Sequence, residues 1–135
     1  MGTVEWFLGT HFFWRQTPEE TAVHMNQLGF SRNLVERFDM QDRNETSVCT
    51  PYKSGCPVDS IKGGNSSEEQ TPAQQRRTQS YQSLVGSIGW LSNITRPDMA
   101  ICHAFLASYT HCLTAGHLKA ALHALHYTHS THMFY

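Results

Sequence analysis

The sequence predicts an α+β fold that is mostly helical. Three observations predict it: an aromatic, strand-like stretch near the N-terminus, a 3.6-residue apolar period that dominates the last third, and a length of 135 residues, which suits one domain. Strand-like patterns occur only in the first 28 residues. We therefore expect an N-terminal β-hairpin over residues 1–28, followed by helices.

The expected hairpin consists of two runs separated by a polar break. The stretch from Val4 to Phe13 is rich in aromatic residues, and residues 22–27 alternate apolar with polar side chains, which is the period of a half-buried strand. Residues 15–20 between them are polar and include Pro18, so the chain is expected to turn there.

The pattern then changes to that of a short helix over residues 29–42. Its apolar residues recur at i, i+4, i+5 and i+8, which places them on one helical face; they are Phe30, Leu34, Val35 and Phe38. Residues 43–78 hold most of the Pro, Gly, Ser and Gln and show no period. We expect a variable, mobile loop there, although so long a loop is unusual inside a compact domain.

Residues 79–135 are expected to form helices. The first follows the 3.6-residue period and ends near Thr95, because Pro97 suits the first turn of a new helix. The second is expected to run to about Tyr109, and a third to open near His117. The side chains that the second helix should bury are Ile101, Phe105 and Leu106.

Charge and hydropathy narrow the class of protein. Ten Lys and Arg against eleven Asp and Glu give a net charge of −1, which argues against a stand-alone nucleic-acid binder that works by bulk charge. No apolar run is long enough for a membrane span, and the first residues do not resemble a signal peptide. We expect an intracellular chain that is neither secreted nor bound to a membrane; the sequence does not distinguish cytoplasm from nucleus.

The residues offer no catalytic site. No Asp-Asp pair, no Gly-x-Ser-x-Gly motif and no phosphate-binding loop occurs. Seven of the nine histidines follow residue 102. Those in the last stretch recur every three residues, and because three residues rotate by about 300° in a helix, their side chains drift away from one face and do not converge on a metal. Histidines on a polar helix surface are therefore favoured over a metal site by about four to one. We predict no catalytic residue, no bound metal and no cofactor for this chain.

Several sequence blocks follow one another in a characteristic order. The blocks are Trp6-Phe7-Leu8-Gly9, Val23-His24-Met25-Asn26-Gln27, the segments 34–42 and 50–51, the segment 81–91, which begins Tyr81-Gln82-Ser83-Leu84-Val85-Gly86-Ser87, then Thr95-Arg96-Pro97-Asp98-Met99-Ala100, His117-Leu118-Lys119-Ala120-Ala121 and the segment 127–131. In order and spacing they resemble the reverse transcriptase of copia-type LTR retrotransposons, downstream of its catalytic aspartates. The combination of the block at residues 81–87 with Thr-Arg-Pro-Asp is the most specific part, and only about residues 53–79 fall outside the resemblance.

The resemblance implies an incomplete right-hand polymerase. Residues 1–28 would be the palm-end hairpin, residues 29–42 a thumb helix, and residues 79–135 the helical thumb and connection. The catalytic aspartate pair would lie before Trp6 and the ribonuclease H carboxylates beyond Tyr135, so the chain alone is expected not to be an enzyme. Mg²⁺ would be needed only by the intact polymerase.

The resemblance also implies roles for individual residues. Those that would contact the template-primer are Trp6, Phe7, Leu8, Gly9, Gln82 and Gly86. Those with a structural role in the family motifs are Tyr81, Thr95, Arg96, Pro97, Asp98 and His117.

The residues themselves leave other roles open. From residue type alone, burial in the core is favoured over contact with nucleic acid by about three to one for Trp6, Phe7 and Leu8. Gly86 and Gly89 could allow close helix packing as readily as contact with a primer. Arg96 could simply cap a helix or pair with Asp98.

Our leading hypothesis is a non-catalytic fragment of a retrotransposon reverse transcriptase that positions the template-primer. Its partners would be RNA or DNA template-primer and the remainder of the Pol polyprotein. The alternatives are a relic or domesticated helical interaction module, whose exposed apolar faces would bind partners, and a metal-binding protein that uses the C-terminal histidines.

Overall fold

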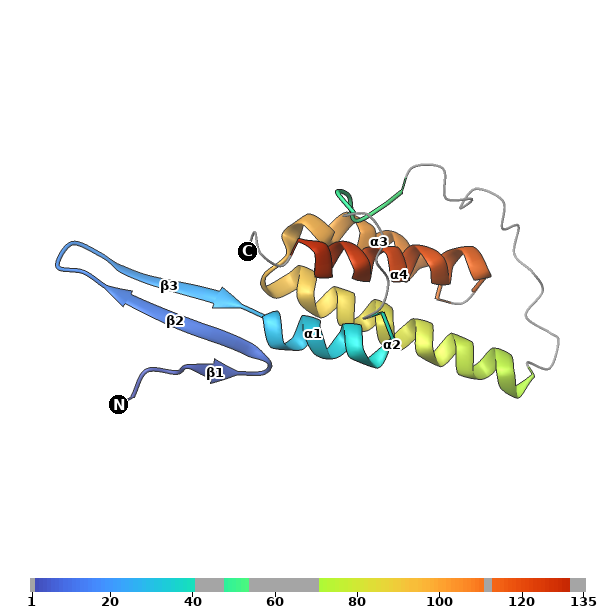
Figure 1. Cartoon of the computed structure of the whole chain (residues 1–135), viewed down its shortest axis with the longest axis horizontal. Helices are drawn as coiled ribbons and strands as arrows, with labels where there is room; N and C mark the ends of the chain where they lie inside the picture. The colour runs from blue at the N-terminus through green and yellow to red at the C-terminus, as the bar shows by residue number, and fades with distance from the viewer. Residues whose placement is uncertain (1, 41–47, 54–70, 111–112, 132–135) are drawn as a thin grey trace.

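A narrow antiparallel sheet projects from one end of a helical bundle in the computed structural model (Figure 1). The structure describes residues 2–40, 48–53, 71–110 and 113–131. The elements follow in the order β1, β2, β3, α1, α2, η1, α3, α4, where η1 is a single 3-10 turn. This arrangement confirms the expected α+β, mostly helical class.

The sheet has three strands in the order β1-β2-β3, all antiparallel. The strands are β1 (Trp6–Phe7), β2 (Thr10–Gln16) and β3 (Thr21–Asn26). The expected hairpin is present as β2 and β3, and the chain turns between them at residues 17–20. Thr17 closes this turn by donating its backbone N–H to the carbonyl oxygen of Glu20 at 2.8 Å.

The first run, expected as one strand from Val4 to Phe13, is divided in two. Leu8 and Gly9 form a tight turn with φ of 48° and 78°, and Phe7 pairs with Thr10 across it. Two successive positive φ values match the type I′ turn that suits a two-residue hairpin. The N-terminal unit is therefore a three-stranded sheet rather than a single hairpin.

The helices enclose one apolar core. They are α1 (Leu28–Arg37), α2 (Pro72–Ile94), η1 (Pro97–Met99), α3 (Ala100–Ser108) and α4 (Ala115–Ser130). Helix α2 packs against α3 and α4, and α1 packs against α4. The fully buried centre includes Leu84, Ile88, Leu106 and Leu125. No helix in the part of the chain described here is long and apolar enough to cross a membrane.

Helix α2 begins earlier than the sequence pattern indicated, so residues 72–78 are helical and not loop. Thr71 and Gln74 form a capping box: the Thr71 backbone N–H donates to Gln74 Oε1 at 2.9 Å, and Pro72 occupies the first turn. Residues 71–77 are all exposed, so no apolar period marks this part of the helix.

The rest of the predicted loop is described only at residues 48–53. There, Tyr52 packs edge-on against Phe105 at 5.1 Å between ring centroids, and His123 Nε2 lies 3.0 Å from the Thr50 carbonyl oxygen. This piece therefore packs against α3 and α4. The expected mobility of residues 43–47 and 54–70 concerns positions outside the described residues.

The second predicted helix is rotated relative to the expected face. Ile101 is 86% exposed, whereas Cys102 and Leu106 are buried. Met99, Cys102 and Leu106 form the inward stripe at spacings of three and four, and Ile101 lies outside this stripe and points to solvent. The prediction that Ile101 is buried is wrong, and Phe105 is half-buried under the ring of Tyr52.

Candidate nucleic-acid interface

The tight turn between β1 and β2 carries an exposed apolar side chain on strained backbone. Leu8 has φ of 48°, in the left-handed region, and its side chain is 63% exposed. This conformation costs a non-glycine residue about 1 kcal/mol. Because the side chain gains little burial in return, the turn is a candidate contact site for another molecule.

The neighbouring aromatic residues of β1 are also on the surface. Trp6 and Phe7 are each 59% exposed. The indole of Trp6 lies beside the His11 ring, at 5.5 Å between centroids, and reaches to within 3.4 Å of where a Cβ on Gly29 would stand. The expectation from residue type that Trp6, Phe7 and Leu8 belong to the core is wrong: β1 is an edge strand beside the start of α1 (Figure 1), and all three side chains stay more than half exposed.

The two faces of the β2–β3 hairpin differ in chemistry. On one face the register places Phe12 opposite Met25 and Trp14 opposite Val23. This pairing makes an apolar strip, of which all but Phe12 is exposed.

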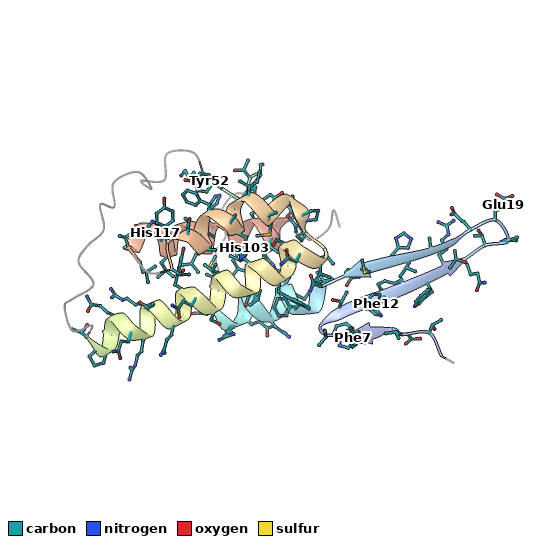
Figure 2. All side chains as sticks on the ribbon, turned by 180° about the vertical axis from the view of Figure 1, so that it is seen from behind. Phe7, Phe12, Glu19, Tyr52, His103 and His117 are labelled. Carbon is teal, nitrogen blue, oxygen red and sulfur yellow. The ribbon has the colours of Figure 1, made fainter. Side chains whose placement is uncertain are left out.

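The opposite face is aromatic and imidazole-rich. The His11 and Phe13 rings lie 4.0 Å apart, and Phe13 pairs across the strands with His24. Arg15 is the one charged residue on the described β2 and β3 strands. The acidic side chains of this hairpin are confined to its tip, where Glu19 lies far from Phe7 (Figure 2).

Helix α2 supplies the second predicted contact surface. Gln82 and Gly86 are both exposed and, four residues apart, lie on the same face. A Cβ added to Gly86 would meet nothing within 4 Å. Along its whole length α2 carries two arginines, Arg76 and Arg77, and no acidic residue. This face is polar, small and free of negative charge.

Gly89, one turn further on, has a different role. A Cβ there would lie 2.5 Å from His103 Nε2, so the missing side chain makes room for α3 to pack against α2. His103 lies between these helices in Figure 2. Of the two glycines whose roles the sequence left open, Gly89 therefore serves helix packing and Gly86 does not.

The two sets of predicted contact residues are on separate elements. Among the described residues, no hydrogen bond or ring contact joins the Leu8 turn to Gln82 or Gly86. The sheet and α2 are linked instead through the junction at the end of α2. There Thr95 donates from Oγ1 to the Gln27 Oε1 at 2.8 Å.

The Thr-Arg-Pro-Asp stretch is a structural junction. Arg96 is 4% exposed and forms a two-point ion pair with Asp98: Nε to Oδ1 at 3.0 Å and Nη2 to Oδ2 at 2.9 Å. The sequence left this pairing open as one role of Arg96, and the structure contains it. The pair sits at the start of η1, where Pro97 occupies the first position and Asp98 the positive helix end.

Helix α4 closes around the same ion pair. Tyr127 donates from its hydroxyl to Asp98 Oδ2 at 2.8 Å, and the Arg96 guanidinium lies 5.3 Å from the centre of the Tyr127 ring. Arg96 Nη2 also donates to Thr131 Oγ1 at 2.7 Å. Two hydrogen bonds and a cation–π contact therefore fasten the end of α4 to the junction.

The ion pair shifts the titration of both partners. Burial alone would raise the pKa of Asp98, but the hydrogen bonds from Arg96 and Tyr127 and the Arg96 charge outweigh burial and hold that pKa below its usual value. Burial alone would lower the pKa of Arg96, but the bond to Asp98 and its charge raise it. Both side chains are therefore held in their charged forms.

Tyr81 and His117 also have structural surroundings. Tyr81 is fully buried and donates its hydroxyl to the Leu106 carbonyl oxygen at 2.7 Å; burial raises the pKa of Tyr81 to about 12. His117 Nδ1 accepts from the Thr114 backbone N–H at 3.2 Å and so caps α4. Its ring stacks on Tyr109 at 4.5 Å.

The C-terminal histidines do not form a metal centre in the part of the chain that is described, where no group of three or more ligand-type side chains converges. The expectation that they lie on a polar helix surface is wrong for His117 and His126, which are 1% and 7% exposed. His126 faces inward because α4 is packed against by both α1 and α2. His132 lies outside the described residues.

Two residues at the junction received no individual role from the sequence. Gln27 follows β3 directly and accepts a hydrogen bond from Thr95, and Tyr127 donates one to Asp98. Each belongs to a polar pair that is 68 or 29 residues apart in sequence, so no local spacing could have identified it.

Comparison of the chain with protein-family models, curated proteins and solved structures finds no match in any of the three.

Proposed function

We propose that the chain is a non-catalytic fragment of a copia-type retrotransposon reverse transcriptase that helps to position the template-primer. The observation that supports this most is the Leu8 turn, because a strained, exposed apolar residue there contributes little to the fold. Gly9, with φ of 78°, completes the turn without strain, and the side chain that it lacks would point at Phe30 of α1, so the exposed surface of the turn is that of Leu8.

The surface of α2 supports the same proposal. A helix of about 10–12 Å diameter cannot enter a B-form minor groove about 6 Å wide, but it can lie along the wide, shallow minor groove of an A-form duplex. Gln82 offers hydrogen bonds to sugar hydroxyls, and Gly86 presents bare backbone. The absence of acidic residues from α2 removes repulsion of the phosphates.

The test measures the affinity of the full chain for a labelled RNA–DNA primer-template by fluorescence anisotropy at several salt concentrations. We expect Leu8→Asn to weaken binding about fivefold, the effect of losing about 1 kcal/mol of apolar contact. Asn tolerates positive φ better than Leu, so this variant should fold at least as well. The matched control is Ile101→Gln, which removes an apolar side chain from α3 that is even more exposed than Leu8.

The outcomes separate the proposal from its competitors. Equal affinities for the unaltered chain and Leu8→Asn, or salt-independent binding, would contradict it. We also expect no primer extension by the chain with Mg²⁺ and dNTPs, and extension above a heat-treated control would overturn the non-catalytic part of the proposal.

A second function is favoured by one specific observation. Trp14, Val23 and Met25 form an exposed apolar strip on one face of the hairpin, of the kind that binds protein partners. If the chain is an interaction module, its self-association in sedimentation experiments without nucleic acid should increase with protein concentration. In that case Trp14→Ser should abolish association and leave primer-template binding absent in both proteins.

A further inference from the structure

A small cavity lies at the root of the sheet, where β3 runs into α1. It has a volume of about 30 Å³ and is bounded by the C-terminal end of α2 and by α4. Met25, Leu28 and Leu91 form the apolar part of its wall.

Gln27 brings an unsatisfied polar group to this cavity. Its side chain is 97% buried, and while Oε1 accepts from Thr95 Oγ1 at 2.8 Å, Nε2 has no hydrogen-bond partner among the described residues. Turning the amide over would give Thr95 an N–H donor and leave the oxygen without a partner instead. In either orientation one polar atom of Gln27 lacks a bond that buried groups normally make.

We propose that this cavity binds an ordered water molecule that completes the hydrogen bonding of Gln27. The volume exceeds the roughly 10–15 Å³ needed by one water. Water both donates and accepts, so it satisfies the amide in either orientation. Hydroxyl groups from α1, from α4 and from the residue after α2 line the same space and offer the further partners that a buried water needs; they belong to Ser31, Thr128 and Thr95.

The site joins the sheet to the bundle. Gln27 is the first residue after β3, and its bond to Thr95 reaches across 68 positions of sequence. A water held there links this residue to hydroxyls of α1 and α4 as well as to the end of α2. The water is therefore part of the joint that sets the direction of the sheet, whatever molecule the sheet contacts.

The test counts long-lived internal waters in the full chain by oxygen-17 magnetic relaxation dispersion. We expect one fewer such water in Gln27→Met, which keeps the side-chain length and removes both polar atoms. The control Gln82→Met makes the same change on the exposed face of α2 and should leave the count unaltered.

A crystal structure of the unaltered chain provides the second measurement and does not depend on how the variants fold. We expect a water oxygen within about 3.2 Å of the Gln27 amide. Equal water counts in the unaltered chain and in Gln27→Met would overturn the proposal, as would a cavity that is dry or filled by a protein side chain.

Discussion

Two glycines one turn apart on α2 should respond in opposite ways to the same substitution. Gly86→Ala adds a methyl group where nothing lies within 4 Å, so only helix propensity changes. Alanine is favoured over glycine in a helix by about 0.8–1.0 kcal/mol. We therefore expect Gly86→Ala to raise the free energy of unfolding by about 1 kcal/mol.

Gly89→Ala makes the same gain in propensity but meets a neighbour. The added Cβ would lie 2.5 Å from His103 Nε2 and 2.9 Å from Cε1, so the whole imidazole must move. Overpacking of this kind costs about 1–3 kcal/mol. The net effect of Gly89→Ala should therefore lie between neutral and about 2 kcal/mol destabilising.

Urea unfolding followed by circular dichroism measures both free energies. The decisive variant is His103→Ala, because removing the imidazole should convert Gly89→Ala into a stabilising change of about 1 kcal/mol. Equal stabilisation by Gly86→Ala and Gly89→Ala in the natural background would refute the reasoning, since it would mean that α3 does not approach α2 at Gly89.

Three further predictions concern the buried polar groups and a helix end. Tyr81→Phe should lower the free energy of unfolding by about 1 kcal/mol at neutral pH. Because the pKa of Tyr81 is raised to about 12, the unaltered chain should lose up to about 2.7 kcal/mol of stability as the pH rises from 10 through 12. Urea midpoints measured across this pH range should show a smaller loss in Tyr81→Phe. The lowered pKa of Asp98 contributes stability that is present above pH 4 and lost as the pH falls through the folded pKa, so Asp98→Asn should be less stable at pH 7 and show a shallower acid transition. Thr71→Ala should cost about 1 kcal/mol locally and shorten α2, which amide hydrogen exchange at residues 73–78 would report.

The start of α2 shows why apolar periodicity alone misplaces a helix boundary. Residues 72–78 have no period because that end of α2 projects beyond the core and is exposed on all sides. The boundary was nevertheless encoded in Thr71, Pro72 and Gln74, which form a capping box with proline at the first position. Capping residues predict where a helix begins even where no apolar face exists.

Two other differences have distinct physical causes. The Leu8 turn could not be read from residue type, because type I′ turns favour Asn or Gly at the first central position and leucine is unfavourable there. The burial of Cys102 in place of Ile101 depends on which side of α3 packs against the bundle, because Met99, Cys102 and Leu106 share a helical face as regular as that of Ile101 and Phe105. The hairpin, α1 and the apolar face of α2 needed no such information and were predictable from their periods.

The junction and the exposed turn test different parts of the proposed function. The Thr-Arg-Pro-Asp stretch carries much of the resemblance to reverse transcriptases, yet its side chains bond to Gln27, Tyr127 and Thr131 inside the molecule. That stretch therefore bears on the fold, and a polymerase fragment and a repurposed interaction module would both retain it. Arg96→Leu should accordingly leave Asp98 without its charge partner and lower stability by about 3–5 kcal/mol, with any loss of primer-template binding following from unfolding.

Leu8→Asn should do the reverse, with stability kept or raised and binding of the primer-template weakened. Measuring both quantities on both variants separates the two roles. If Leu8→Asn lowered stability as Arg96→Leu does, the turn would belong to the fold, and the main support for a nucleic-acid contact there would be lost.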